Sequence, residues 1–374
     1  MNNHGKPAIP FVDLGTQFDS LETEVMEAVR AVAKSSAFIR GAPVQEFEQA
    51  FAELHGAQHA IGVGSGTDAL NLSVQALDLE PGDEIITVPN TWISTAFAIS
   101  QAGATPVFVD IDPGTYQMDP EQFSQAITER TKAVIPVHMF GHPAPMDKLE
   151  KICRNKKIRI IEDVAQAPLA NSDGRTVGTI GSLGCFSFYP SKNLGAYGDG
   201  GLVLTSDDQL AESVRQLANY GQSETYNHVQ IGINSRLDTL QAAILLCKLP
   251  KLESWTKKRR TAAKVYDELL ASLPIKRAAT AEGAQPVYHL YVIEVDDRDN
   301  CLRWLQDNGV MAQVHYPSVI HLQECYQHLG YKKGDFPAAE KAADRMISLP
   351  IYPEITPDQI GRVVATLKEF LEVA

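Results

Sequence analysis

Cysteines are few in this sequence and long apolar runs are missing, which narrows the class of protein. The 374 residues include five cysteines, widely spaced and without a C-x-x-C pair. Such a set is typical of a reducing cytoplasm and offers no zinc framework. No apolar run approaches the length of a membrane span, and the start, MNNHGKPAIPFVDLGTQ, has no basic segment followed by an apolar one. We therefore expect a soluble, cytoplasmic protein without a signal peptide.

Positive charge is also scarce. Lys and Arg number 33 against 46 Asp and Glu, which gives a net charge of −13. Duplex nucleic acid and anionic membranes both attract concentrated positive charge, so we expect neither as a partner. The ten histidines show no H-E-x-x-H or similar spacing, and His138 and His142 merely flank a glycine in a predicted loop. We therefore expect no metal site.

Short β-rich runs alternate with helical stretches through the first 205 residues. This alternation predicts βαβ units around a mostly parallel sheet. The strands are expected at 60–63, 84–88, 106–110, 133–138, 159–162, 184–188 and 201–205. The helices are expected at 18–34, 44–55, 67–77, 93–102, 120–129 and 146–155.

The pattern changes in the last third of the chain. Residues 236–270 read as nearly all helical, with a break or kink at Pro250. A strand at 288–295, a helix at 299–308 and two later helices ending at Val373 follow. We therefore predict a large α/β domain over 1–250, with a helical lead, and a smaller α+β domain over 251–374.

A lysine follows the strand that ends near Pro190. Lys192 could be an ordinary surface residue, as most lysines in loops are. The alternative is a Schiff-base lysine, whose amine attacks an aldehyde and later carries protons. The loop alone does not decide between these, although its next residues include four glycines: Gly195, Gly198, Gly200 and Gly201.

Two adjacent carboxylates, Glu162 and Asp163, stand at the end of another predicted strand. The carboxyl ends of parallel strands point into a ligand crevice, which favours Asp163 as a site residue. It would then keep a pyridine nitrogen protonated, so that the ring accepts electrons. A helix-capping aspartate is an equally good interpretation of this segment.

Two further segments complete the pattern. In VGSGTDAL, glycines and hydroxyls at a helix start suit a phosphate, although Thr67 could simply cap that helix. Its spacing matches neither a P-loop nor a dinucleotide fingerprint. In PNTWIST, Trp92 is either a core residue or a planar ring beside a cofactor. Anion site, aromatic ring, aspartate and lysine each follow a predicted strand, and together they favour pyridoxal phosphate as cofactor.

The sequence resembles the DegT/DnrJ/EryC1/StrS family of pyridoxal-phosphate-dependent sugar aminotransferases over essentially its whole length. The resemblance implies fold type I: a large domain whose central, mostly parallel seven-stranded sheet is sandwiched by helices, plus a smaller C-terminal α+β domain. The motifs that carry it are GSGTDAL, PNTWISTA, PVHMFGHPAPM, IEDVAQA, FSFYPSKNLGAYGDGG, GINSRLDTLQAAIL and VHYPSVIHLQ.

The resemblance also implies roles at the cofactor. Lys192 corresponds to the Schiff-base lysine and proton carrier, and Asp163 to the partner of the pyridine nitrogen. Gln166 is expected at the ring O3′ and Trp92 against the ring face. Three residues are expected at the phosphate: Gly66, Thr67 and Ser187.

The resemblance also implies that four residues later in the chain lie at the boundary between subunits or contact the substrate. Asn234 corresponds to an asparagine that reaches the phosphate of the neighbouring subunit's cofactor, which implies a homodimer with composite sites. Arg236, His315 and Tyr316 fall where the family meets its nucleotide sugar. The simpler interpretations are a turn residue for Asn234, an ion pair for Arg236 and a structural histidine for His315.

The implied reaction moves an amino group from L-glutamate, leaving 2-oxoglutarate, to a keto group of a dTDP- or UDP-linked sugar. The motifs SRLDTLQAAIL and VHYPSVIHLQ favour C3 of a 3-keto-6-deoxyhexose. Amination at C4 is the alternative, although those relatives often have histidine where Gln166 stands. A dehydratase would have histidine in place of Lys192. A regulatory or sugar-binding protein would have lost site residues that are intact here.

Overall fold

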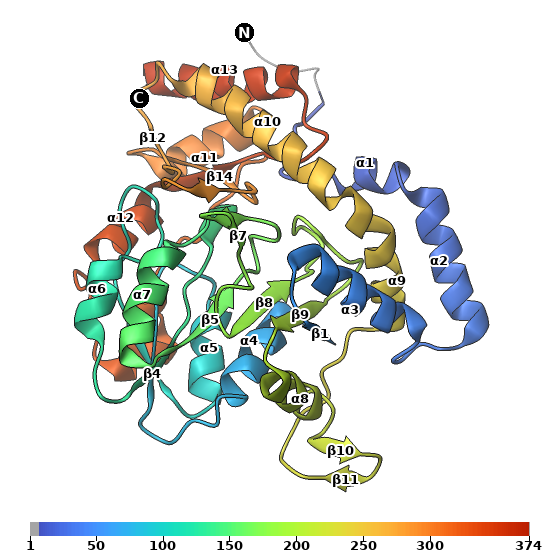
Figure 1. Ribbon diagram of the computed structural model, residues 1–374. Helices are drawn as coiled ribbons and strands as arrows, with labels where there is room; N and C mark the ends of the chain where they lie inside the picture. The colour runs from blue at the N-terminus through green and yellow to red at the C-terminus, as the bar shows by residue number, and fades with distance from the viewer. Residues whose placement is uncertain (1–6, 374) are drawn as a thin grey trace.

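A seven-stranded sheet forms the centre of the larger part of the computed structural model, which describes residues 7–373 (Figure 1). The strand order is β1-β9-β8-β5-β4-β2-β3. Strand β9 runs antiparallel to both neighbours, whereas the other adjacent pairs are parallel. All seven strands predicted from the sequence are present, and the mostly parallel sheet is confirmed. They are β1 (His59–Val63), β2 (Glu84–Thr87), β3 (Thr105–Phe108), β4 (Thr131–Val134), β5 (Arg159–Asp163), β8 (Leu183–Ser187) and β9 (Gly201–Thr205).

Helices cover both faces of this sheet, so its strands are apolar on both sides. In β9, Leu202 and Leu204 pack in one cluster with α3 and α9, while Val203 packs in another with α4 and α8. The sandwich that the family resemblance implies is therefore confirmed. The covering helices are α3 (Ala42–His55), α4 (Gly66–Gln75), α5 (Ser94–Gln101), α6 (Pro120–Ala126), α7 (Met146–Lys156), α8 (Asp208–Leu217) and α9 (Thr239–Lys248).

The helical lead consists of α1 (Leu14–Asp19) and α2 (Glu22–Ser35) rather than one helix over 18–34. The Asp13 side chain accepts a hydrogen bond from Thr16 N and starts α1 earlier than predicted. The Ser20 hydroxyl donates to the backbone oxygen of Gln17, and this local bond competes with helix continuation. The expected absence of a signal peptide rests partly on residues 1–6, which lie outside the described residues.

A smaller antiparallel sheet and long helices form the C-terminal part, at the top of Figure 1. The expected break at Pro250 is a single 3₁₀ turn, η2 (Leu249–Lys251), between α9 and the long helix α10. One apolar cluster joins residues from both sides of residue 250, among them Leu149 and Ala339, so the boundary between 250 and 251 stays a prediction. The elements are α10 (Leu252–Leu270), β12 (Lys276–Arg277), β14 (Tyr291–Glu294), α11 (Arg298–Asp307), α12 (Pro337–Arg345), β15 (Met346–Leu349) and α13 (Pro357–Val373).

Short elements complete the fold. The strands β10 (Gln222–Glu224) and β11 (Asn227–His228) form a hairpin that projects at the bottom of Figure 1. A second small sheet contains β6 (Asn171–Ser172), β7 (Arg175–Thr176) and β13 (Ala284–Gln285). Three further 3₁₀ turns are η1 (Met139–Gly141), η3 (Ile320–Leu322) and η4 (Glu324–Leu329).

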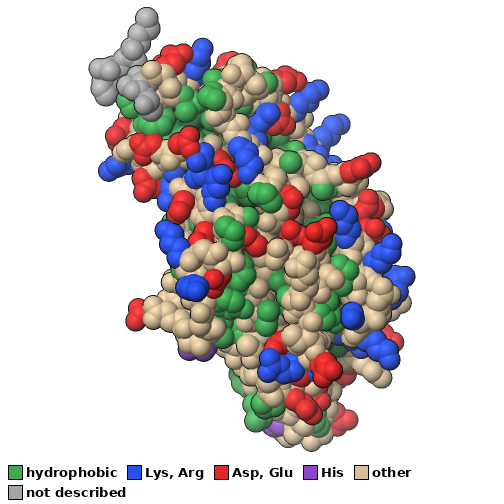
Figure 2. Space-filling model, turned by 90° about the vertical axis from the view of Figure 1, so that its left-hand side faces the viewer, with side chains coloured by type: hydrophobic (Ala, Val, Ile, Leu, Met, Phe, Trp, Pro, Cys, Tyr) green, Lys and Arg blue, Asp and Glu red, His purple; other side chains and the backbone are tan. Residues whose placement is uncertain are grey.

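The surface mixes charges of both signs. Figure 2 shows acidic and basic side chains interspersed over one face of the molecule. Within residues 7–373, no helix combines the length and apolar character that crossing a bilayer requires.

Candidate active site

Nine of the eleven predicted site residues meet in one cavity of about 460 Å³. The chain segments that follow β1, β2, β5 and β8 all contribute to its wall, as expected for the carboxyl edge of a parallel sheet. The nine residues are Gly66, Thr67, Trp92, Asp163, Gln166, Ser187, Lys192, His315 and Tyr316.

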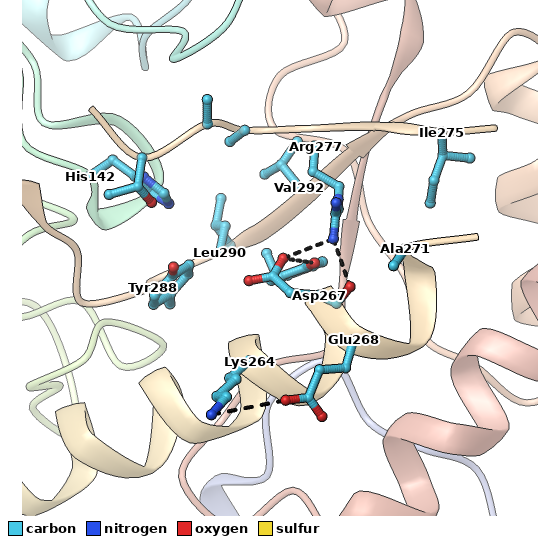
Figure 3. Close-up of a pocket in the computed structure, with 14 residues that line it drawn as sticks. His142, Lys264, Asp267, Glu268, Ala271, Ile275, Arg277, Tyr288, Leu290 and Val292 are labelled. Atoms are coloured by element: carbon cyan, nitrogen blue, oxygen red, sulfur yellow. Dashed lines mark hydrogen bonds and ion pairs between the residues drawn. The ribbon is translucent and has the colours of Figure 1, made fainter. Parts of the chain in front are cut away.

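A larger cavity of about 690 Å³ lies elsewhere, between α10 and β14 (Figure 3). None of the predicted site residues lines it. Its charges are paired with one another, since Arg277 Nη1 lies 3.2 Å from Asp267 Oδ1 and Lys264 Nζ lies 4.0 Å from Glu268 Oε1. Convergence of functional groups, rather than volume, therefore identifies the smaller cavity as the candidate site.

One end of the site is suited to an anion. Ser65 caps α4 by accepting a hydrogen bond from Asp68 N, so the alternative in which Thr67 is the cap is wrong. The Thr67 hydroxyl instead lies 2.8 Å from the Ser94 hydroxyl. A Cβ atom on Gly66 would lie 2.6 Å from Ser187 Cβ, so only glycine lets this helix start approach the end of β8. Free backbone N–H groups, the helix dipole and these hydroxyls suit a phosphate.

Asp163 occupies the end of β5 and is buried. Its Oδ1 accepts from Ala165 N at 3.1 Å and its Oδ2 from the Thr95 hydroxyl at 2.9 Å. Burial raises the pKa of Asp163, while these two donors and the charge of Lys192 act against that rise. Residues 164–170 form no helix, so the helix-cap alternative for Asp163 is wrong.

Lys192 lies in the loop after β8, with its charge close enough to Asp163 for each to affect the other. Burial lowers the pKa of Lys192 to about 8, although the Asp163 carboxylate acts in the opposite direction. The loop folds back closely, since a Cβ on Gly195 would lie 2.2 Å from the Pro190 carbonyl oxygen. A desolvated amine with this pKa is unlike an ordinary surface lysine and is suited to nucleophilic attack.

The amide of Gln166 has a fixed orientation. Its Oε1 accepts from Phe140 N at 2.6 Å, which leaves Nε2, 3.4 Å from the Tyr316 hydroxyl, as the donor end. Trp92 is 56% exposed, which rules out the core interpretation. Its ring lies 5.3 Å from the ring of Tyr316, so two aromatic side chains from distant segments flank the cavity.

His315 has structural partners in addition to its place in the cavity. Its Nδ1 lies 2.9 Å from the Ser348 hydroxyl, and its ring stacks on Phe11 at 5.4 Å. Burial, and secondarily the charge of Lys192, lowers the pKa of His315 to about 4. The imidazole is therefore neutral at physiological pH.

Asn234 and Arg236 are not among the residues that line the described cavity. Asn234 is exposed and Arg236 is half-buried. Ser235 between them tethers the segment to the anion end, because its hydroxyl donates to Asp68 Oδ2 at 2.7 Å and accepts from Gly64 N at 2.9 Å. The structure thus brings this segment near the site without bringing these two side chains into it.

The structure adds site residues that the sequence reasoning did not single out. Thr95 bonds to Asp163, and His289 lines the cavity beside Lys192, whose charge adds to burial in lowering the pKa of His289 well below its usual range. Thr95 stands in the quoted motif PNTWISTA, whereas nothing in the sequence near His289 signals a site. In the described part of the chain, no three His, Cys, Asp or Glu side chains are grouped as a metal site would require.

Known proteins share this architecture along the whole chain. The crystal structure of Streptomyces venezuelae DesV in complex with a ketimine intermediate matches with a TM-score of 0.96 at 41% identity, over 98% of this chain and 99% of that chain. The crystal structure of ntda from Bacillus subtilis with bound cofactor PMP matches with a TM-score of 0.90 at 30% identity, over 100% and 87% of the two chains.

Sequence comparison gives the same result. A Geobacillus stearothermophilus protein named pleiotropic regulatory protein is 43% identical over 97% of this chain and 98% of its own. A Streptomyces venezuelae protein named dTDP-3-amino-3,4,6-trideoxy-alpha-D-glucose transaminase is 41% identical over 98% of this chain and 97% of its own. The model of the DegT/DnrJ/EryC1/StrS aminotransferase family matches residues 19–368. The chain therefore belongs to the DegT/DnrJ/EryC1/StrS aminotransferase family and is a sugar-nucleotide aminotransferase that depends on pyridoxal phosphate.

Proposed function

We propose that this enzyme moves an amino group from L-glutamate to the C3 keto group of a dTDP- or UDP-linked 3-keto-6-deoxyhexose. The observation that carries the chemistry is the intact set of Lys192, Asp163 and Gln166 in one cavity beside an anion-binding helix start. The choice of C3 is supported by the motifs of the sequence and by the name of the Streptomyces venezuelae relative. A C4 aminotransferase remains the alternative.

The residues present fit pyridoxal phosphate. The start of α4, with Gly66, Thr67 and Ser187, would hold the phosphate, because the close approach of Gly66 to Ser187 forms a cradle that a Cβ would fill. Asp163 would keep the pyridine nitrogen protonated, and Trp92 would cover a face of the ring. When bound, the cofactor supplies an electron-accepting ring that stabilises negative charge on the adjacent carbon.

Lys192 is the proposed covalent anchor and proton carrier. Its pKa of about 8 leaves part of the amine unprotonated at neutral pH, which attack on an aldehyde requires. Once released from that bond, Nζ would take the proton from the α-carbon of glutamate and deliver it within the site. Its position near Asp163 keeps the proton carrier and the ring partner in one buried environment.

Gln166 is proposed to donate a hydrogen bond to the ring O3′. The backbone N–H of Phe140 already occupies the amide oxygen, so the amide nitrogen is the atom available in the cavity. Tyr316 and His315 would meet the nucleotide sugar from the C-terminal part. The low pKa of His315 makes its imidazole a neutral hydrogen-bonding group rather than a cation for the diphosphate.

Asn234 and Arg236 are proposed to act at a boundary between two subunits. Asn234 would reach the partner's cofactor phosphate, which makes the functional unit a homodimer, and Arg236 would supply positive charge for the sugar nucleotide. Exposed apolar side chains in the nearby hairpin region support a protein contact, since Tyr226 is 90% and Ile231 is 95% exposed.

The test uses the two half-reactions separately. Glutamate converts the enzyme to its pyridoxamine form, which is then mixed with dTDP- and UDP-linked 3-keto and 4-keto sugars in turn. We expect the absorbance of the lysine-bound cofactor to return with a 3-keto sugar. Return with a 4-keto sugar alone would establish C4 amination instead. Failure of the glutamate half-reaction would favour a regulatory or sugar-binding protein.

A further inference from the structure

Two adjacent hydroxyls at the start of α5 reach two different parts of the site. The Ser94 hydroxyl lies 2.8 Å from that of Thr67 at the anion end. The Thr95 hydroxyl lies 2.9 Å from Oδ2 of Asp163, 68 residues away in the chain. Both side chains are buried, and both follow directly on the turn that carries Trp92. Hydrogen bonds therefore connect the residues after this turn both to the anion end of the site and to Asp163.

The proton of the Thr95 hydroxyl has one favoured acceptor. Three oxygen atoms lie within reach: Asp163 Oδ2 at 2.9 Å, Thr91 Oγ1 at 3.3 Å and the Trp92 carbonyl oxygen at 3.3 Å. The carboxylate is both the nearest and the charged acceptor, and hydrogen bonds to ionised groups are the stronger ones. Thr91 is then free to donate to Thr95, which gives a short chain of hydroxyls ending on the carboxylate.

Asp163 depends on such donors because it is buried. Its two oxygens receive one backbone and one side-chain hydrogen bond, from Ala165 and Thr95. Burial raises the pKa of Asp163, and each donor favours the ionised form. The titratable groups that interact with Asp163 are Lys192, His138, Cys185 and Tyr316.

We propose that Thr95 is a positioning residue, whose hydroxyl keeps the Asp163 carboxylate ionised and oriented and fastens it to the Trp92 turn. This inference rests on the proposed role of Asp163 as partner of the pyridine nitrogen. Loss of the hydroxyl leaves the carboxylate with its single backbone donor. The Asp163 carboxylate is then less often ionised and less fixed in orientation, and the turn that carries Trp92 has lost one of its hydrogen bonds to the rest of the site.

The test compares three substitutions at two buried threonines whose hydroxyl hydrogen bonds the structure defines. Thr95→Val removes the hydroxyl at nearly constant volume, and Thr95→Ser keeps it. Thr87→Val is the matched control, because Thr87 is equally buried and its hydroxyl donates to the Ile135 carbonyl oxygen, outside the residues that line the site. Pyridoxal phosphate is titrated into each apoenzyme, and the visible absorbance of each loaded enzyme is followed against pH.

We expect Thr95→Val to weaken pyridoxal phosphate binding by about tenfold to a hundredfold, the range for one hydrogen bond to a charged group. At a given pH, the visible absorbance of this variant should indicate that a smaller fraction of the cofactor's pyridine nitrogen is protonated. Thr95→Ser should bind within about threefold of the unmodified enzyme, and Thr87→Val should bind equally well. Should Thr95→Val not fold, Thr95→Ala carries the same expectation without added bulk.

Unchanged affinity and pH profile in Thr95→Val would overturn the inference, and so would a Ser variant as impaired as the Val variant. Asp163→Asn separates this from the proposed function. If Asp163→Asn is impaired and Thr95→Val is not, the role of Thr95 alone is wrong. If Asp163→Asn itself binds and absorbs normally, the proposed role of Asp163 is wrong, and the inference with it.

Discussion

His138 and Glu162 form a fully buried pair, with 3.0 Å between Nε2 and Oε2, and Glu162 directly precedes Asp163 in β5. Glu162 also accepts three backbone hydrogen bonds, from Gly178, Ile180 and Gly181, at 2.6–2.7 Å. Four hydrogen bonds to one buried carboxylate hold the Glu162 side chain in a single position. It holds the strand end, and therefore the base of Asp163, against the loop that precedes β8.

Replacing Glu162 by glutamine should therefore cost stability. The NH₂ group of the glutamine side chain would face donors instead of accepting from them, so at least one buried donor would have no acceptor. We expect this to lower the free energy of unfolding by about 1–3 kcal/mol. Urea unfolding measures this. Glu150→Gln is the control, since partly exposed Glu150 pairs with Arg154 and Arg175 and should lose less than about 1 kcal/mol. Equal losses in the two variants would contradict the prediction.

Lys192→Ala should remove the visible absorbance of the lysine-bound cofactor and all turnover, because no other amine replaces the proposed anchor. Borohydride reduction followed by mass spectrometry should add the cofactor mass to the unmodified chain and not to the variant. Lys248→Ala tests whether another buried lysine substitutes, since the pKa of Lys248 is also lowered by burial to about 8. A Lys192→Ala enzyme with normal turnover would make the assignment wrong.

The capture of pyridoxal phosphate by the apoenzyme should depend on pH through Lys192. Only the neutral amine attacks, so a pKa of about 8 predicts a rate that rises about tenfold from pH 7 to pH 9 and then levels off. For an ordinary lysine the rate would still rise about sevenfold between pH 9 and pH 10, and that result would contradict the prediction. Asp163→Asn should move the midpoint to lower pH, because it removes the charge that favours the protonated amine.

Gly66→Ala should weaken cofactor binding by at least about tenfold, because the new Cβ would lie 2.6 Å from Ser187 Cβ and push the helix start away from β8. Equilibrium titration of the apoenzyme measures the effect. Gly361→Ala is the matched control. Gly361 lies within α13 with nothing within 4 Å of a Cβ, so alanine there should leave binding unchanged and add about 0.5–1 kcal/mol to stability.

Mixed dimers test the proposed composite site. Lys192→Ala and Asn234→Ala should each be impaired alone, the second through weaker cofactor binding. If Asn234 serves the partner, a mixed dimer contains one intact site, and random exchange should restore about a quarter of the activity. Activity is measured after co-refolding the two variants in equal amounts. No recovery would show that Asn234 acts within its own chain or not at the cofactor.

Much of the fold was predictable because its strands are buried on both faces. The run GLVLT in β9 has apolar side chains at three consecutive positions, Leu202, Val203 and Leu204, as a strand buried on both faces requires, so this strand could be predicted without knowing its neighbours. The division of the lead into α1 and α2 was not predicted, because it depends on a hydroxyl bond between Ser20 and Gln17 that competes with the helix locally.

The candidate site was predictable where its residues follow strands. Asp163 is the last residue of β5 and Lys192 lies in the loop after β8, so the topology alone brings them to one edge of the sheet. His289 and the bond between Thr95 and Asp163 depend on contacts between segments far apart in the chain, for which local pattern gives no signal. The roles of Asn234 and Arg236 stay predictions, because they depend on a second subunit.

The stacking of Phe11 on His315 joins the beginning of the chain to its last quarter at one rim of the cavity. During synthesis on the ribosome, the sheet and Lys192 emerge long before His315 and Tyr316. The nascent chain therefore has the anchoring amine without the far wall of its pocket. The cavity that would enclose the cofactor is therefore complete only after most of the chain, up to Tyr316, has been synthesised.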